Sequence, residues 1–440
     1  VRYAASGRAE RFRARIQHVL YGFIDHWHEP LLATCPKLLE NYQLGLNTGD
    51  HEYAVLSAHV YCLNCFLTGK NLSDLAQEMA LYSQVMHQFK RATTLNFQTV
   101  WHQVVLNLRG ESPWPTVLRG AVYDEVEQIP IHQQRQDATA LLIVYWHKAV
   151  LNYWFGQGEL ALTYIEQSAE YLQGIPGLPI VPVWHFYDAL IHLDQFDKAD
   201  SAGRADVLGR VAQIKEKFQR WIAFAPQNHE HRIALIQAER SRVLGEVSDA
   251  MQAYDAAIDF AQALGYVHEL ALANERAAQL YEAMGNQKIA RLYLKEAVSA
   301  YTRWGAVAKL KDLEIRYPQL APPRKMLRMK QGIQWDTTET DSEQLDILSV
   351  LKASQALATV ILLDKLLTQL MTLVLESAGA QKGYFVTCRQ QQWWIEAIAI
   401  KHREVGIVRR KEVAETEVPI GLVNYVMRSK KSVVLPSENR

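Results

Sequence analysis

The 440-residue chain has little cysteine, no excess of either charge and no long hydrophobic run. Its four cysteines are too few for a disulfide framework, which favours a reducing compartment. Basic and acidic side chains number 47 each, so partners must be recognised by shape or by local patches of charge. The longest apolar run, residues 356–363, is far too short to span a membrane. We therefore expect a cytoplasmic protein that binds neither membrane nor nucleic acid.

The first 110 residues contain little glycine or proline and carry apolar residues at helical spacing. The N-terminal segment is basic and helical and does not have the pattern of a signal peptide. Short turns separate the expected helices. In the first turn Asp50 is placed to cap the helix that follows, and in the second Gly69 is placed to end one helix and Ser73 to cap the next. The pattern predicts stacked helical hairpins.

A repeat with an offset of 40 residues lies between positions 232 and 306. When Gly245 is placed over Gly285, Ala250 meets Ala290 and Gly265 meets Gly305. A glycine in the turn and small residues where helices cross are what a helical hairpin repeat needs. The pattern resembles a tetratricopeptide-type repeat with lengthened helices. We expect a mostly α-helical solenoid over residues 1–317, in which each unit buries its apolar face against its neighbours.

The composition changes after residue 317. Residues 318–344 contain three prolines and an acidic stretch, and are expected to form a linker. A long helical pattern follows from Leu345. Two β-rich runs, "GYFVTC" and "QWWIEAIAI", then predict a hairpin, and a further helix and strand are expected after Pro419.

This order of elements resembles a known family. Residues 345–440 resemble the opening of a GAF domain, from the helix "VLKASQALATVILLDKLLTQLM" through "AGAQKGYFV" to "VPIGLVNYVMRSKKSVVLPS". The block "YLKEAVSAYTRWGAVAKLKDLEIRYPQL" resembles the end of the helical repeats in large bacterial sensor proteins. Those proteins run from a kinase-like domain and an AAA-type ATPase through helical repeats to a GAF domain and a histidine kinase. The resemblance implies an internal or truncated piece of such a protein, with an incomplete antiparallel sheet in a partial α+β domain.

The function that this resemblance implies is regulatory and not catalytic. The repeats would bind protein partners through a concave surface, and the GAF-like part would sense a small ligand or form a homodimer through its long helix. Binding would bias a two-component kinase output supplied elsewhere, with no cofactor on this chain. The alternative is a free-standing repeat scaffold with a vestigial C-terminal extension. The sequence identifies neither the ligand nor the partner.

Several residues could form sites, and each also has a structural explanation. Tyr384, Phe385, Trp393 and Trp394 could line a ligand pocket, but aromatic residues are also ordinary strand formers, so a place in the sheet core is favoured. Cys388 could attach a chromophore, as in some GAF domains, although a plain strand cysteine is the preferred interpretation.

The possible metal ligands and basic clusters also have simpler explanations. Cys62 and Cys65 form a C-x-x-C motif, but no second pair is present, so core packing is favoured over a metal site. His26, His28 and Glu29 suit packing or interface roles better than metal binding. The basic clusters at 323–330 and 401–411 are interpreted as solvated linker and loop charge, and no catalytic constellation is evident; the basic residues are Arg324, Lys325, Arg328, Lys330, Lys401, His402, Arg403, Arg409, Arg410 and Lys411.

Overall fold

The computed structural model describes residues 7–175, 177–318, 371, 381–389, 392–400, 406–412 and 423. The chain divides into two compact units, Val1–Leu327 and Arg328–Arg440, which are described separately. The expected linker beyond residue 318 and the long helix after Leu345 lie outside the described residues, apart from Met371. So do the expected helix and strand after Pro419, apart from Val423.

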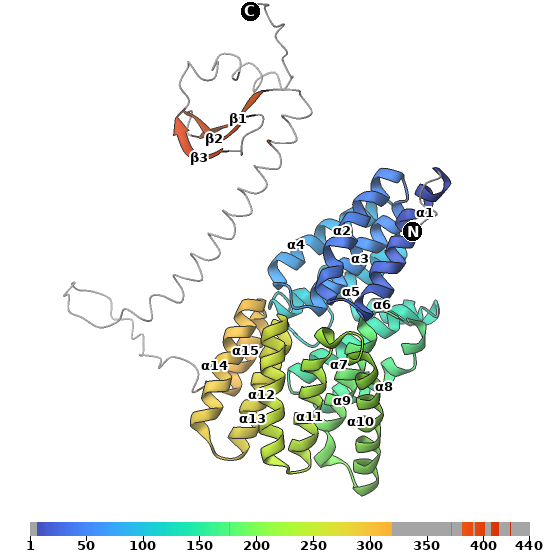
Figure 1. Cartoon of the computed structure of the whole chain (residues 1–440), viewed down its shortest axis with the longest axis vertical. Helices are drawn as coiled ribbons and strands as arrows, with labels where there is room; N and C mark the ends of the chain where they lie inside the picture. The colour runs from blue at the N-terminus through green and yellow to red at the C-terminus, as the bar shows by residue number, and fades with distance from the viewer. Residues whose placement is uncertain are drawn as a thin grey trace, which may run out of the picture. The chain divides into compact units, whose positions relative to one another are not determined.

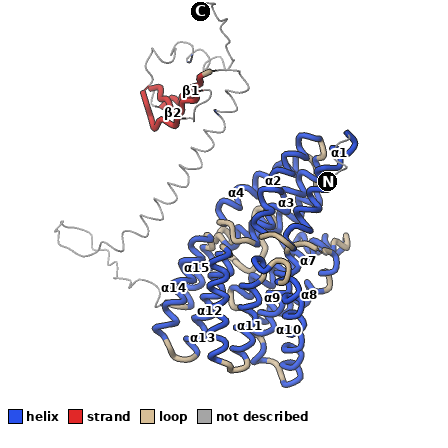
Figure 2. Tube along the Cα trace, viewed as in Figure 1, coloured by secondary structure: helices blue, strands red, loops and turns tan. Residues whose placement is uncertain are grey.

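The first unit is built from α-helices, as the sequence predicts (Figures 1 and 2). Leu20–Ile24 continues the first helix as a π-helix, and Asp25–Trp27 forms a 3-10 turn. The fifteen helices of the described residues are α1 (Gly7–Val19), α2 (Leu31–Thr48), α3 (His51–Leu67), α4 (Leu72–Gln88), α5 (Ala92–Leu108), α6 (Glu125–Gln134), α7 (Ala138–Trp154), α8 (Gly158–Ala169), α9 (Ile180–Asp194), α10 (Ser201–Ile222), α11 (Glu230–Val243), α12 (Val247–Leu264), α13 (Val267–Ala283), α14 (Gln287–Trp304) and α15 (Val307–Arg316).

The helices differ in how much of their surface is apolar, and this difference sorts them into an inner and an outer row. Every residue of α7 from Ala140 to Trp154 is buried, because the helix is apolar on all sides. In α12, by contrast, the buried residues form one stripe of small and aromatic side chains that faces the inner row. Helices α5, α7, α9, α11 and α13 form successive contacts in the inner row, whereas α8, α10, α12 and α14 each pack outside a preceding inner helix.

The early and late helices of the helical unit meet. Helix α15 packs against α5, and Asn71 at the start of α4 donates a 2.9 Å hydrogen bond to the carbonyl of Arg303. The Trp304 ring lies 6.1 Å from Phe66 of α3 and 5.3 Å from Trp154 of α7, centroid to centroid. One continuous hydrophobic core therefore runs from α2 to Tyr317.

Buried ion pairs connect successive inner helices. Arg232 of α11 donates to Glu269 of α13 at 2.9 Å, and Glu239 of α11 accepts from Arg276 of α13 at 2.8 Å. Each pair spans 37 residues, and the arginine lies on α11 in the first pair and on α13 in the second. Burial alone would raise the pKa of Glu239, but Arg276 and Arg242 hold it well below its usual range.

The glycines of the 40-residue repeat lie in the expected turns. Gly245 and Gly285 have φ values of +74° and +76°, which β-carbon-bearing residues adopt at a cost. The small residues Ala250 and Ala290 are buried where helices cross. The caps differ in detail from the prediction, because Asn71 rather than Ser73 caps α4 through a bond from the Ser73 amide.

Replacing one of these turn glycines should destabilise the protein even though space is available. A Cβ at Gly245 would meet nothing within 4 Å, so the whole cost of Gly245→Ala is backbone strain, about 1 kcal/mol. Gly209, within α10, is the matched control: an added Cβ would also meet nothing within 4 Å, but its φ is not positive. Gly209→Ala should therefore raise the free energy of unfolding by roughly 0.5–1 kcal/mol. Urea unfolding measures the free energy of unfolding of both variants. If both substitutions change it in the same direction, the cost at Gly245 does not come from its positive φ.

The second unit contains a three-stranded antiparallel sheet among its described residues, in the order β1–β2–β3 (Figure 1). Strands β1 (Lys382–Arg389) and β2 (Gln392–Ile400) form the predicted hairpin. Strand β3 (Gly406–Glu412) corrects the interpretation of residues 401–411 as loop charge. The β-branched pair Ile407 and Val408, near the start of the segment, favours a strand.

Candidate binding cleft

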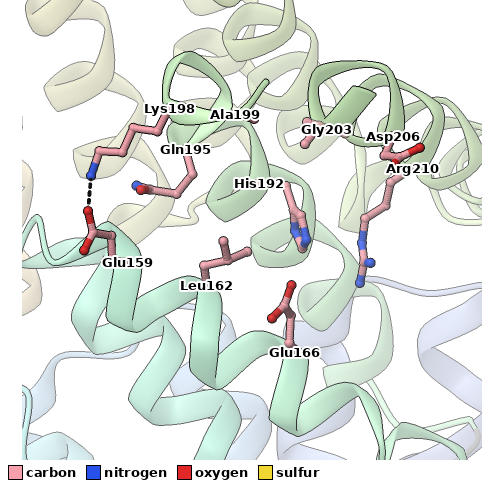
Figure 3. A pocket seen from close by; sticks show the side chains of 11 residues that line it. Glu159, Leu162, Glu166, His192, Gln195, Lys198, Ala199, Gly203, Asp206 and Arg210 are labelled. Carbon is pink, nitrogen blue, oxygen red and sulfur yellow. Dashed lines mark hydrogen bonds and ion pairs between the residues drawn. The ribbon is translucent and has the colours of Figure 1, made fainter. Parts of the chain in front are cut away.

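A cleft of about 550 Å³ opens between α8 and α10, beside the turn that joins α9 to α10 (Figure 3). Leu162, Val207 and Ala199 give it an apolar lining. Helix α8 places its residues there because its buried stripe, Ala161, Ile165 and Ser168, faces the core and turns the neighbouring residues toward α10. The remaining lining residues are Glu159, Glu166, His192, Gln195, Lys198, Gly203, Asp206 and Arg210.

An ion pair crosses one end of the cleft. Lys198 donates a 2.8 Å bond to Glu159, and both side chains are largely exposed. The hydrogen bond and charge of Lys198 lower the pKa of Glu159. An exposed pair of this kind contributes little to stability and can exchange its partners with a ligand.

The other end of the cleft is organised by a buried carboxylate. Asp188 of α9 accepts from Arg210 Nε at 2.8 Å, and its second oxygen lies 3.2 Å from His192 Nδ1. Burial alone would raise the pKa of Asp188, but the neighbouring His192 ring and the hydrogen bond from Arg210 lower it, while His192 Nδ1 itself bonds the main-chain carbonyl of Asp188 at 2.8 Å. Asp188 thereby fixes both side chains at the wall of the cleft, where the half-exposed guanidinium of Arg210 extends toward Glu166 (Figure 3).

The cleft presents both charges around an apolar centre. Its lining residues include no hydroxyl or thiol that could act as a nucleophile. Carboxylates at Glu166 and Asp206 can accept hydrogen bonds, and Arg210 and Lys198 can donate them. The arrangement suits non-covalent binding of a short polar segment or a small zwitterionic molecule.

The four aromatic residues proposed to line a pocket lie on β1 and β2. Successive side chains of a strand point to opposite faces, so Tyr384 and Phe385 face apart, as do Trp393 and Trp394. Thr387 lies opposite Trp394 in the register, so Phe385 and Trp394 share one face. All four are partly exposed. One face of the sheet therefore carries at most two of them.

The cysteines of the C-x-x-C motif do not form a site together. Cys62 and Cys65 are buried in the core, and the Cys65 Sγ lies 3.8 Å from Cys35 of α2. Burial raises the pKa of the Cys62 thiol. Cys388 lies in β1, opposite Trp393 in the register.

The nearby histidines are also separated. His26 is buried in the 3-10 turn, His28 is exposed, and Glu29 pairs with Lys37 at 2.6 Å. Across the residues that the structure describes, no group of three or more histidine, cysteine or acidic side chains could hold a metal ion.

Sequence reasoning missed the cleft and the buried ion pairs. Asp188 and His192 stand four apart in an apolar helix, a spacing that brings two side chains together. Charged residues inside apolar helices are the available signal, because such groups are almost always paired when buried.

The chain matches no protein-family model and no curated protein. Within the described part of the chain, no helix has the length and apolar character needed to cross a bilayer.

Proposed function

We propose that this chain is a non-catalytic regulatory segment of a cytoplasmic signal-transduction protein. The observation that carries the proposal is its division into a unit of paired helices and a separate unit with an antiparallel sheet. In this view the helical unit is a tetratricopeptide-like array that binds protein partners, and the sheet belongs to a GAF-like module that senses a small ligand or dimerises. The chain itself performs no reaction.

The helical unit supports a binding role through its outer surface. The inner row is buried in one core, so partners meet the outer helices and the cleft between α8 and α10. Asp188 holds Arg210 in place before any partner arrives, which reduces the conformational entropy lost on binding. Such a scaffold transmits a signal by favouring one packing of its helices over another.

A second candidate function is a stand-alone repeat scaffold. The closed core of residues 7–318 favours it, because that unit has its own continuous hydrophobic interior. Under this alternative the sheet unit is vestigial and contributes nothing to binding.

The coding sequence on either side of this segment separates the two functions. The sensor proposal expects an in-frame phosphate-loop ATPase upstream and a histidine-kinase core downstream. Unrelated neighbouring genes would reject the sensor and leave the scaffold.

A further inference from the structure

Helix α1 turns an apolar stripe outward. Its exposed large apolar side chains are Phe12 (52%), Ile16 (64%) and Val19 (46%), and the π-helical continuation adds Leu20 (38%) and Ile24 (46%). The spacings of four and three residues place them along one side of the helix. A continuous exposed apolar surface of this kind marks an interaction site.

The opposite face holds the helix rigidly in place. Ala14, His18 and Gly22 are buried, and α1 packs on α2 and α3. Asn41 donates a 2.9 Å bond to the Ala14 carbonyl, and His18 Nδ1 lies 3.1 Å from the Ser57 hydroxyl. The stripe is therefore presented outward without ordering a flexible segment on binding.

The charges beside the stripe are positive. Arg13 and Arg15 are exposed, and with 3.6 residues per turn they lie on opposite sides of the line from Phe12 to Ile16. Arg15 also donates a 2.8 Å bond to Asp50 at the start of α3. The sequence of α1 adds Arg8 and Arg11 and contains one acidic residue, Glu10.

These features select the kind of partner. A second copy of the chain would bring arginines against arginines. A protein partner would form about one hydrogen bond per 100–200 Å² of interface. The stripe consists of apolar side chains and offers few such bonds, so it suits a protein partner poorly. An anionic lipid surface supplies apolar chains and negative headgroups together, and cationic amphipathic helices lie in such surfaces.

We propose that α1 is an interfacial helix that attaches the protein to an anionic lipid surface. Phe12, Ile16, Val19 and Leu20 enter the boundary between headgroups and acyl chains, and Arg13 and Arg15 contact the phosphates. The balanced charge of the whole chain predicts no membrane partner, but this helix carries four arginines and one acidic residue. The inference goes beyond the regulatory role proposed above and places that role at a membrane surface.

The test is co-sedimentation of the full chain with vesicles of phosphatidylcholine containing 30% phosphatidylglycerol. We expect binding that weakens in high salt and in pure phosphatidylcholine vesicles. Ile16→Glu should weaken it by roughly ten- to a hundredfold, because a side chain that enters the lipid becomes charged. Leu292→Glu is the matched control, since Leu292 is 62% exposed on α14 and should leave binding unchanged.

Three results would overturn the proposal. The first is wild-type protein that stays in the supernatant with anionic vesicles. The second is an equal effect of the two substitutions. The third is self-association without vesicles that Ile16→Glu abolishes, which would assign the stripe to a second copy of the chain. Because Ile16 is exposed, circular dichroism of the variant should match that of the wild type.

Discussion

Lowering the pH from about 7.5 to 5 should unfold the helical unit, well before its carboxylates become protonated. The cause is a group of buried histidines in the described residues whose pKa is lowered, so that these rings resist protonation in the folded protein. Burial lowers the pKa of His18, His102, His185 and His268 to about 4, and that of His26 and His147 to about 3. The buried histidines with a lowered pKa are His18, His26, His59, His102, His132, His147, His185, His229, His231 and His268.

The sign follows from proton linkage. Below pH 6.5 the unfolded chain takes up protons at these rings and the folded chain does not, so stability falls as the pH falls, until the folded pKa is reached. Between the unfolded and the folded pKa, each histidine lowers the free energy of unfolding by roughly 1.4 kcal/mol for every unit by which the pH falls. The six with values near 3 to 4 together remove on the order of 10 kcal/mol by pH 5, comparable to a whole domain's stability. Glu239, whose pKa is lowered, loses its contribution only as the pH falls further below 4.5.

Circular dichroism against pH measures this transition, and a paired substitution tests its cause. Both ring nitrogens of His26 are buried without a hydrogen-bond partner, so His26→Leu should lower the pH midpoint of unfolding. His28 is exposed and His28→Leu should leave the midpoint unchanged. A midpoint near pH 3 for the wild type, or equal shifts in the two variants, would show that the histidines do not control acid stability.

Glu239→Gln should cost about 3–5 kcal/mol of unfolding free energy, because it leaves buried arginines without their counter-charge. The carboxylate is fully buried and accepts from Arg276 Nε and Nη2 at 2.8 Å, Arg242 Nε at 2.9 Å and the Tyr254 hydroxyl at 2.6 Å. Arg276 still has an ion pair with Asp194 at 3.0 Å in this variant. Because Asp194 is partly exposed, this pair replaces only part of the interaction lost with Glu239.

Glu246→Gln is the surface control for this prediction. Its carboxylate lies 3.8 Å from Arg240 and is well exposed, so the change should stay within about 0.5 kcal/mol. Should Glu239→Gln fail to fold, the double variant Glu239→Leu with Arg276→Met removes both charges and should recover much of the loss. Urea unfolding distinguishes these cases, and a cost below about 1 kcal/mol for Glu239→Gln would reject the argument.

The sequence predicted the mostly helical character and the β1–β2 hairpin correctly because both depend on local periodicity. Gly245 and Gly285 identified their turns, since positive φ favours glycine strongly. Strand β3 was not predicted because its basic residues are typical of a loop and its β-branched stretch is only two residues long. The opposite directions of Trp393 and Trp394 were available from the sequence, because adjacent strand residues always face apart.

The contacts between distant segments could not be predicted in the same way. Nothing local indicates that Asn71 meets Arg303 or that Phe66 packs beside Trp304. Many apolar faces in the helices are interchangeable by composition, and the global arrangement decides which of them pair. The cleft depends on that arrangement, because Arg210 reaches its wall only when α9 and α10 are packed.

The meeting of the chain's early and late helices has a consequence during synthesis. Asn71 and its partner Arg303 are 232 residues apart, so the apolar end of α3 leaves the ribosome long before α14 exists to cover it. At translation rates of about 5–20 residues per second, that apolar surface stays uncovered for on the order of tens of seconds. Nascent chains of this protein should therefore engage chaperones that bind apolar segments until the last helices emerge.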